Sequence, residues 1–398
     1  MIGVVVEIST DERRRRLGVR HALAPSARAG DPVAAARRVV ALHATDPATV
    51  FLAVRARVDP VTPHDLEDAL YLRRDLVRML GMRRTMFVVP SPLLPVIEAS
   101  TMGRVAGAQR RLLVKHLREA GVPDPANWLV EVEKGTLAAL AARGGAATAT
   151  ELAADEPRLR TTVLLAAGKP YEARPAITSR VLNVLGADGH IVRGRPSGSW
   201  LSQRYQWALA DQWLPVSLDR LPEDEARAEL ARAWLAAYGP APAADLQWWT
   251  GWTGAQVTKA LAALGAVPVE LAEDAGLALP DDLDPTPDPG PWAALLPALD
   301  PTTMGWSRRG WYLGDHTKAL FDTAGNAGPT IWLDGRVVGG WAQRADGEVV
   351  IRLLEDVGAD ATALVEAEAE RLRGWLAAAG DARIVPRFRT PTERDLTR

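Results

Sequence analysis

Residues 175–205, PAITSRVLNVLGADGHIVRGRPSGSWLSQRY, contain the pattern that decides the fold. A helix is predicted over Pro175–Leu185, and Gly186 and Gly189 end it in the manner of helix C-caps. A strand, a tight turn and a second strand follow directly over residues 190–205. A helix followed at once by such a hairpin is typical of the recognition helix and wing of a winged helix-turn-helix unit.

The same order of elements extends to both sides of this stretch. Upstream, a short helix at Thr150–Ala154 supplies the first helix of the same unit. Downstream, helices at 224–237, 243–249 and 254–264 precede a hairpin that begins near Val267, which makes a looser and acidic copy.

The N-terminal residues supply the elements of another unit. Ser9-Thr10-Asp11-Glu12 is an S-x-x-E capping box, which predicts a helix through Arg13–His21. Further elements are predicted as helices at 31–42, at 49–58 and from Pro63, and as a short strand at Arg84–Val89.

Two Asp-Gly turns predict an antiparallel meander near the C-terminus. Asp334-Gly335 lies inside 330–341, and Asp346-Gly347 separates two further apolar stretches. An amphipathic helix is predicted at 360–379, then a last strand at 382–388 and a fraying tail.

The predicted fold class is therefore α+β, with three tandem winged-helix units followed by a C-terminal antiparallel meander and helix. The units are assigned to residues 9–120, 125–215 and 222–280, followed by a proline- and aspartate-rich linker at 281–302 and the C-terminal meander with its helix at 303–398.

Charge is distributed unevenly along the 398 residues, although the net charge is only −2. Residues 1–120 carry 20 basic against 12 acidic residues, whereas residues 216–300 carry 4 against 14. A polyanion would meet the first half of the chain and avoid the third quarter. A genome that favours arginine over lysine would give a similar excess, so charge alone leaves both explanations open.

Several classes of site are excluded by composition. The absence of cysteine excludes disulfides, thiolate zinc sites and a cysteine nucleophile. The six histidines form no pair at i, i+4, and no phosphate loop or Gly-x-Ser-x-Gly motif occurs, so no metal and no cofactor are expected. No apolar run is long enough to cross a membrane, and the start MIGVVVEIST lacks the features of a signal peptide, which predicts a cytoplasmic protein.

Four segments stand out: ALHATDPATVFLAVRARV (41–58), MRRTMFVVP (82–90), LLPALDPTTMGW (295–306) and GNAGPTIWLDGRVVGGW (325–341). They resemble a bacterial family of tandem winged-helix DNA-binding proteins. Members of that family include DNA glycosylases of the azinomycin-resistance type, which excise alkylpurines and unhook interstrand crosslinks. Because the segments come from both ends of the chain, the resemblance covers nearly all of it.

The resemblance implies a catalytic segment in the first unit. Glycosylases of the family carry a Gln-apolar-Gln or Gln-apolar-Asp motif, and the aligned residues here are His43, Ala44 and Thr45. The leaving group of an N-alkylated purine nucleotide is already cationic before the bond breaks, so the enzyme must mainly position a water near C1′ and stabilise charge on the sugar. His43 as a water-positioning base, partnered by the Thr45 hydroxyl or the Asp46 carboxylate, satisfies this need.

A structural role for the same residues is equally open at this point. His43 could end a helix, where a cation or donor is favourable against free carbonyls. Asp46 could be the N-cap of the helix near Thr49, with Pro47 at its first position.

The predicted DNA contacts gather on wings, turns and one helix. Each arginine alone could be a solvated surface charge, but as a group they predict a DNA face. The residues are Arg193, Arg195, Ser197 and Arg204 on the wing, Ser179 and Arg180 on the preceding helix, Arg83 and Arg84 behind the first unit, and Arg308, Arg309 and Arg336 in the C-terminal region.

These features together predict a metal-free, monofunctional DNA glycosylase. It is expected to act as a monomer on double-stranded DNA in the cytoplasm, at the nucleoid, and to excise N7-adducted purines or unhook crosslinks. The alternative is a non-catalytic DNA-binding protein, either a transcription regulator or a damage sensor, which the altered motif favours. A third possibility is an interaction domain that has lost DNA binding, as the acidic third quarter would suggest.

Overall fold

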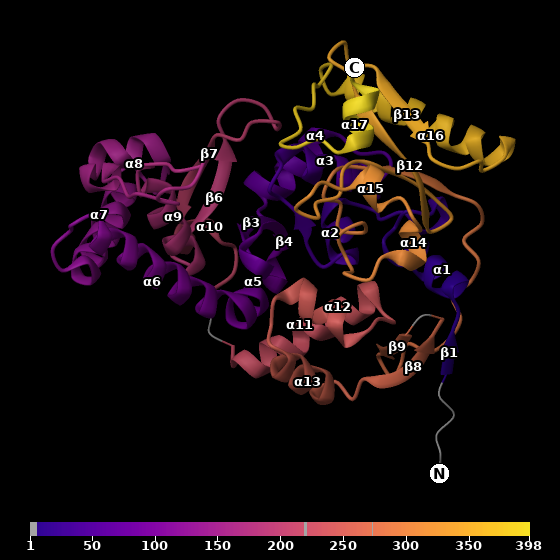
Figure 1. The fold of residues 1–398 in the computed structure, drawn as a ribbon, viewed down its shortest axis with the longest axis horizontal. Coiled ribbons are helices and arrows are strands. Elements are labelled where there is room, and N and C mark those ends of the chain that lie inside the picture. The colour runs from indigo at the N-terminus through magenta and orange to yellow at the C-terminus, as the bar shows by residue number, and fades with distance from the viewer. Residues whose placement is uncertain (1–5, 219–220, 273) are drawn as a thin grey trace.

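The computed structural model describes residues 6–218, 221–272 and 274–398, so the apolar residues 1–5 lie outside it. The fold is mixed α and β, with helices arranged around three separate sheets (Figure 1). The residues from 103 to 218 form one end of the molecule, and the C-terminal residues lie at the other.

The first part of the chain alternates short helices and strands. The Ser9 hydroxyl caps the first helix by accepting from the Glu12 backbone N–H at 3.1 Å. The elements are β1 (Val6–Ile8), α1 (Thr10–Arg20), α2 (Pro32–Arg38), β2 (Leu42–His43), α3 (Pro47–Arg55), α4 (Pro63–Glu67), β3 (Leu76–Leu80), β4 (Met86–Pro90), α5 (Leu94–Ile97) and α6 (Gly103–Glu119).

The helix predicted over 31–42 ends early, at Arg38. Val40 adopts a positive φ of 64°, which a helix cannot accommodate, and the chain turns there. Leu42 and His43 then pair antiparallel with Val88 and Phe87 as strand β2. His43 is therefore a strand residue and not the end of a helix.

The predicted helix and hairpin of residues 175–205 are present, with a shifted second strand. That strand begins at Tyr205 because Trp200 is buried against Phe51 and Trp375 instead. The elements are α7 (Pro125–Ala142), β5 (Ala146–Thr148), α8 (Ala149–Asp155), α9 (Thr178–Ala187), β6 (Ile191–Pro196), β7 (Tyr205–Leu209) and α10 (Ala210–Trp213).

The three helices and the hairpin predicted between 224 and 279 are also present. Strand β1, from the start of the chain, adds to this hairpin in parallel with its first strand. The elements are α11 (Glu223–Tyr238), α12 (Ala243–Thr250), α13 (Gly254–Ala263), β8 (Val267–Leu271) and β9 (Asp274–Ala278).

The C-terminal meander forms at both predicted Asp-Gly turns. Asp334 and Gly335 adopt φ values of 47° and 84°, as a tight hairpin turn requires. The elements are β10 (Ala293–Leu296), α14 (Gly310–Leu313), α15 (Thr317–Leu320), β11 (Thr330–Leu333), β12 (Arg336–Gln343), β13 (Val349–Leu353), α16 (Ala359–Ala378) and α17 (Pro391–Leu396).

Two C-terminal expectations need correction. The stretch 281–302 is not only a linker, because its residues 293–296 form β10, which pairs antiparallel with β11. Residues 382–388 form no strand, and the tail does not fray: Thr390 and Glu393 form a capping box that begins α17. The high proline and aspartate content of 281–302 predicted irregular structure, so the four-residue strand β10 was not expected.

The predicted first and second units share one sheet. Its six strands run in the order β2-β4-β3-β6-β7-β5, and Arg78 of β3 lies opposite Arg193 of β6 where the two parts join. Helix α6 falls within the predicted first unit, residues 9–120. It buries Leu113 and Leu117, however, in a core with Leu182 of α9. It therefore packs with the second unit.

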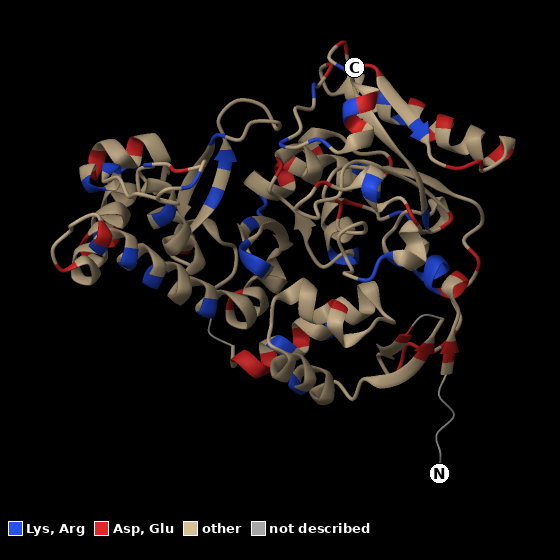
Figure 2. Ribbon diagram, in the orientation of Figure 1, with Lys and Arg blue, Asp and Glu red and all other residues tan. Residues whose placement is uncertain are grey.

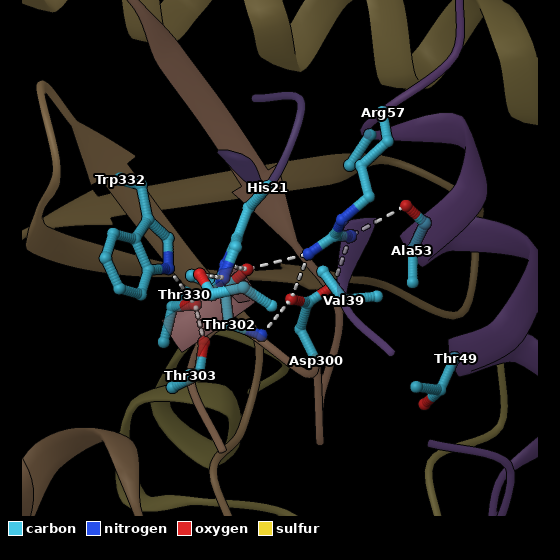
Figure 3. Close-up of polar contacts among 12 residues, drawn as sticks. His21, Val39, Thr49, Ala53, Arg57, Asp300, Thr302, Thr303, Thr330 and Trp332 are labelled. Carbon is cyan, nitrogen blue, oxygen red and sulfur yellow. Dashed lines mark hydrogen bonds and ion pairs between the residues drawn. The ribbon is translucent and has the colours of Figure 1, made fainter. Parts of the chain in front are cut away.

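A buried ion pair connects segments that are far apart in the chain. Arg57, just after α3, forms two hydrogen bonds to the Asp300 carboxylate at 2.7 and 2.9 Å, and neither side chain is exposed. Arg57 also donates to the Thr302 hydroxyl, which contacts His21 Nδ1 at 2.8 Å (Figure 3). The pair joins the N-terminal helices to the strand-rich C-terminal part.

Replacement of one partner of this pair should destabilise the protein strongly. Asp300→Ala leaves the Arg57 guanidinium buried without its anion, which should lower the unfolding free energy by about 3–5 kcal/mol. Urea denaturation measures the loss. Glu348→Ala removes an exposed ion pair with Arg344 and should change it by less than about 1 kcal/mol. Equal losses in the two variants would contradict the importance of the buried pair.

Candidate active site and nucleic-acid interface

The segment His43–Asp46 connects strand β2 to helix α3. The Asp46 carboxylate caps α3 by accepting from the Ala48 backbone N–H at 3.0 Å, and Pro47 occupies the first helical position. The capping role considered for Asp46 is thus confirmed. Burial raises the pKa of Asp46, partly offset by its hydrogen bond from Ala48 and by the Arg387 charge.

The His43 imidazole lies on the face of the sheet that carries Phe87, with the two ring centroids 5.5 Å apart. It is 8% exposed, and its Nδ1 has no hydrogen-bond partner among the described residues. Burial, reinforced by the nearby Arg83 charge, lowers the pKa of His43 to about 3. The ring is therefore neutral at physiological pH and can accept or donate one hydrogen bond without carrying charge.

The expected pairing of His43 with Thr45 or Asp46 is not formed: within the described ranges, neither residue bonds to the imidazole. Thr45 is half-buried, and its carbonyl accepts from Arg387 at 2.8 Å. Strand β2 ends at His43, and Thr45 and Asp46 lie in the bend that leads into α3.

A group of cations surrounds the junction between β3 and β6. Arg78 and Arg193 face each other across the two strands, and their guanidinium carbons lie 4.6 and 5.5 Å from the Tyr205 ring centroid. Arg78 also donates to the Ala44 carbonyl at 2.9 Å, which ties this junction to the His43–Asp46 segment. We call Arg78, Arg193 and Tyr205 the seam cluster.

The seam cluster has more hydrogen-bonding capacity than its neighbours use. Arg78 is 1% exposed, yet its Nε and Nη2, the Arg193 Nε and the Tyr205 hydroxyl lack partners within the described residues. The Asp46 carboxylate interacts electrostatically with both Arg78 and Tyr205 but forms no hydrogen bond with either among the described residues. Buried cations without a paired carboxylate are costly, and an anionic ligand would relieve that cost.

Cation–π contacts extend this basic region along the hairpin. Arg195 is exposed and stacks over Tyr71 at 5.0 Å, and Arg193 stacks over Trp207 at 4.9 Å. Ser197 and Arg204 are exposed in the loop beyond, where the Ser197 N–H donates to the Arg204 carbonyl.

A second group of arginines lies around Trp248. The guanidinium carbons of Arg83 and Arg309 lie 4.0 and 5.2 Å from the centroid of its ring, although the two arginines are far apart in the sequence. Arg83 and Arg84 both have positive φ values, 54° and 64°, which are uncommon for residues with a Cβ. The turn between β3 and β4 therefore holds these two side chains in a constrained orientation, with Arg84 exposed.

The other predicted contacts are more scattered. Ser179 is exposed and Arg180 half-exposed in the first turn of α9. Arg308 is already paired with Asp274, and Arg336 with Glu355. These two arginines form ion pairs with neighbouring acids. Among the described residues, the arginines of the β6–β7 hairpin have no such pair.

Sequence reasoning missed Arg78, Tyr205 and Arg387. A signal for Arg78 was available, because it is a charged residue inside the apolar strand LVRML at 76–80. Such a residue needs a buried partner or a ligand. Tyr205 was assigned to the hairpin only, and no local pattern indicates that Arg387 returns to contact Thr45.

Two kinds of feature are absent from the described residues. Across the described part of the chain, no helix is long and apolar enough to cross a membrane. The same residues contain no group of three or more histidine, cysteine, aspartate or glutamate side chains arranged to hold a metal ion.

Comparison with known proteins agrees with this arrangement. A model of the family described as "DNA glycosylase AlkZ-like" matches residues 36–375. A solved structure, Streptomyces sahachiroi DNA glycosylase AlkZ, superposes with a TM-score of 0.73 at 21% identity, over 93% of this chain and 98% of that one. No curated protein sequence matches.

The chain belongs to the AlkZ-like DNA glycosylase family. The family predicted from the four segments is thus confirmed, and a DNA glycosylase is favoured over a non-catalytic binding protein.

The neutral state of His43 is directly measurable. Since its pKa is lowered to about 3, its imidazole signals should not titrate between pH 5 and 8. Histidine ring NMR spectra recorded across this range, with His43→Gln to assign the signal, measure this. A midpoint near 6.5, the value of a free imidazole, would show that His43 is solvated and charged in acid.

Proposed function

We propose that this protein excises N7-alkylated purines from double-stranded DNA and unhooks crosslinks formed at the same atom. It acts as a monofunctional enzyme that needs no metal. It works as a monomer at the nucleoid in the cytoplasm. This function narrows the family assignment to one class of lesion and one form of DNA.

The observation that carries this proposal is the position of the His43–Asp46 segment beside the seam cluster. Arg78 bonds to Ala44 within the segment, and its remaining nitrogens are buried without partners. Guanidinium groups bind phosphate oxygens in fork geometry, so the backbone around a target nucleotide would satisfy them. A base held by its phosphates here would lie next to Ala44–Asp46, whereas the His43 ring lies on the opposite face of the sheet, with Phe87 and Met79.

The protonation state of His43 supports this class of lesion. A neutral imidazole with a pKa of about 3 is a poor proton donor at pH 7 because it is not protonated. An N7-alkylated purine is already cationic and leaves as a neutral base without being protonated. The reaction then needs a positioned water and stabilisation of positive charge on the sugar, and not a general acid.

The residues of the segment would divide this work. His43 Nδ1, which has no partner among the described residues, is free to bond to the attacking water. Thr45, in the bend that follows, supplies a hydroxyl contact. The Asp46 carboxylate supplies negative charge near the developing oxocarbenium ion while it caps α3.

The helix and hairpin pairs supply the DNA-binding scaffold in this proposal. Helix α9 with the β6–β7 hairpin, and α13 with the β8–β9 hairpin, each have the order of a recognition helix and wing. We propose that the helices and strands from α2 to β4 complete three tandem winged-helix units. The β6–β7 hairpin follows the duplex because it carries Arg193, Arg195 and Arg204, whereas the β8–β9 region is acidic (Figure 2).

Replacement of His43 should separate catalysis from binding. His43→Ala removes the hydrogen bond that positions the attacking water, so it is expected to reduce excision of N7-methylguanine by about a hundredfold and to leave duplex affinity within a few-fold. Hot-alkali cleavage of the labelled strand measures excision. His64→Ala, at an exposed histidine, is the matched control. Equal loss of excision and affinity would make His43 structural, and salt-sensitive binding without any excision by the wild type would favour a non-catalytic protein.

The charge of Asp46 can be tested separately from its role as the N-cap of α3. Asparagine is as good an N-cap as aspartate, so Asp46→Asn should keep the melting temperature while it removes the carboxylate. Because the pKa of Asp46 is raised, wild-type excision should fall as acid protonates it, and Asp46→Asn should be slow at every pH. Stopped-time excision assays from pH 4 to 8 measure both effects. Wild-type excision rates in Asp46→Asn would limit Asp46 to capping α3.

A further inference from the structure

Four basic residues occupy one face of helix α6: Arg104, Arg111, Lys115 and Arg118. Their spacing of 7, 4 and 3 residues places them within a narrow arc because an α-helix has 3.6 residues per turn. All four are exposed, whereas the opposite face of the helix is buried in the core. Figure 2 shows basic segments repeated along α6.

The N-terminal end of this face opens onto a cleft. The cleft has a volume of about 680 Å³ and lies between α6 and helices α11, α12 and α13. Arg83, Arg84, Arg104 and Arg111 contribute to its lining. Its one lining carboxylate within the described residues, Glu223, pairs with Arg227, so the four other arginines give the cleft a positive charge.

The charges on this face are available to a ligand. The side chains of Arg84, Arg111 and Arg118 have no hydrogen bond or ion pair in the described part of the chain, and Lys115 is 3.8 Å from Glu119. The Arg104 guanidinium donates only to the Gly251 carbonyl among the described residues. Arg110 of the same helix differs from these residues, because it points away from this face and forms ion pairs with Glu133 and Asp188.

We propose that Arg84, Arg104, Arg111, Lys115 and Arg118, the α6 track, bind the sugar–phosphate backbone of one DNA strand beside the target base. The proposal rests on the proposed function and adds a surface to it. Guanidinium and ammonium groups on one exposed helix face suit phosphates and cannot read base edges, so the track supplies affinity without sequence preference.

The length of the track fits a duplex. From Arg104 to Arg118 it spans about 21 Å at a rise of ~1.5 Å per residue. Phosphates of one strand advance about 3.4 Å along the DNA axis per nucleotide, so the track matches about six of them.

The track also begins at the candidate active site. Arg84 lies in the turn before β4, and β4 pairs with the strand that carries His43. The charge of Arg83, its neighbour in that turn, already acts on His43. A strand that leaves the site past this turn meets the cleft and then the exposed face of α6.

The salt dependence of binding tests the track in the full-length chain. The variant Arg111→Gln/Arg118→Gln removes two phosphate contacts, so the slope of log K against log salt should fall by about two for an undamaged 30-base-pair duplex. The control, Arg352→Gln/Arg373→Gln, removes two exposed arginines paired with Asp395 and Glu370 on the C-terminal part. It loses the same charge and should keep the wild-type slope.

The two proposals fail in different ways. An unchanged slope in Arg111→Gln/Arg118→Gln, or an equal fall in the control, would overturn the α6 track even if the wild type excises bases. A fall of about two in the track variant alone supports the track, and it does so even if the wild type excises no base. Melting temperatures of both variants establish that each is folded.

Discussion

The Arg57–Asp300 ion pair is the constraint on which the arrangement of the chain depends. Both groups are fully buried, and the carboxylate receives two hydrogen bonds from the guanidinium and one from the Thr302 backbone N–H. A buried charge pair of this kind repays its desolvation only when its geometry is complete. It therefore holds α3 against residues 297–306, and α3 in turn fixes the end of the His43–Asp46 segment.

The junction between β3 and β6 connects this part of the fold to the β6–β7 hairpin. One sheet runs from β2 to β5, and its two parts join at the single pair Arg78–Arg193. The β6–β7 hairpin is thus connected through β3 and β4 to the strand that carries His43.

The sequence predicted the parts that depend on local rules. The helix and hairpin at 175–205, the three helices and hairpin after 223, both Asp-Gly turns and the Asp46 cap follow from periodicity, turn chemistry and capping preferences. The helix predicted over 31–42 wrongly included Leu42, because the strand conformation of this residue depends on pairing with β4. Strand β10 was missed for a similar reason, since its partner lies more than thirty residues away.

The candidate site shows the same division. His43, Thr45 and Asp46 were identified through resemblance. Only the tertiary structure shows that the His43 imidazole is buried and neutral, and that the Asp46 carboxylate accepts from the Ala48 backbone N–H. Arg78 and Arg387 reach the segment through contacts that span 34 and 342 residues of sequence. No local pattern encodes such contacts.

Direct detection of the released base tests the account most simply. The wild-type protein is incubated with duplex DNA that contains N7-methylguanine, without added metal and with a chelator, and the products are analysed by mass spectrometry. The account predicts free N7-methylguanine in a one-to-one ratio with abasic sites in unbroken strands. Intact lesion DNA after full binding, or strand breaks formed together with base release, would contradict a monofunctional glycosylase.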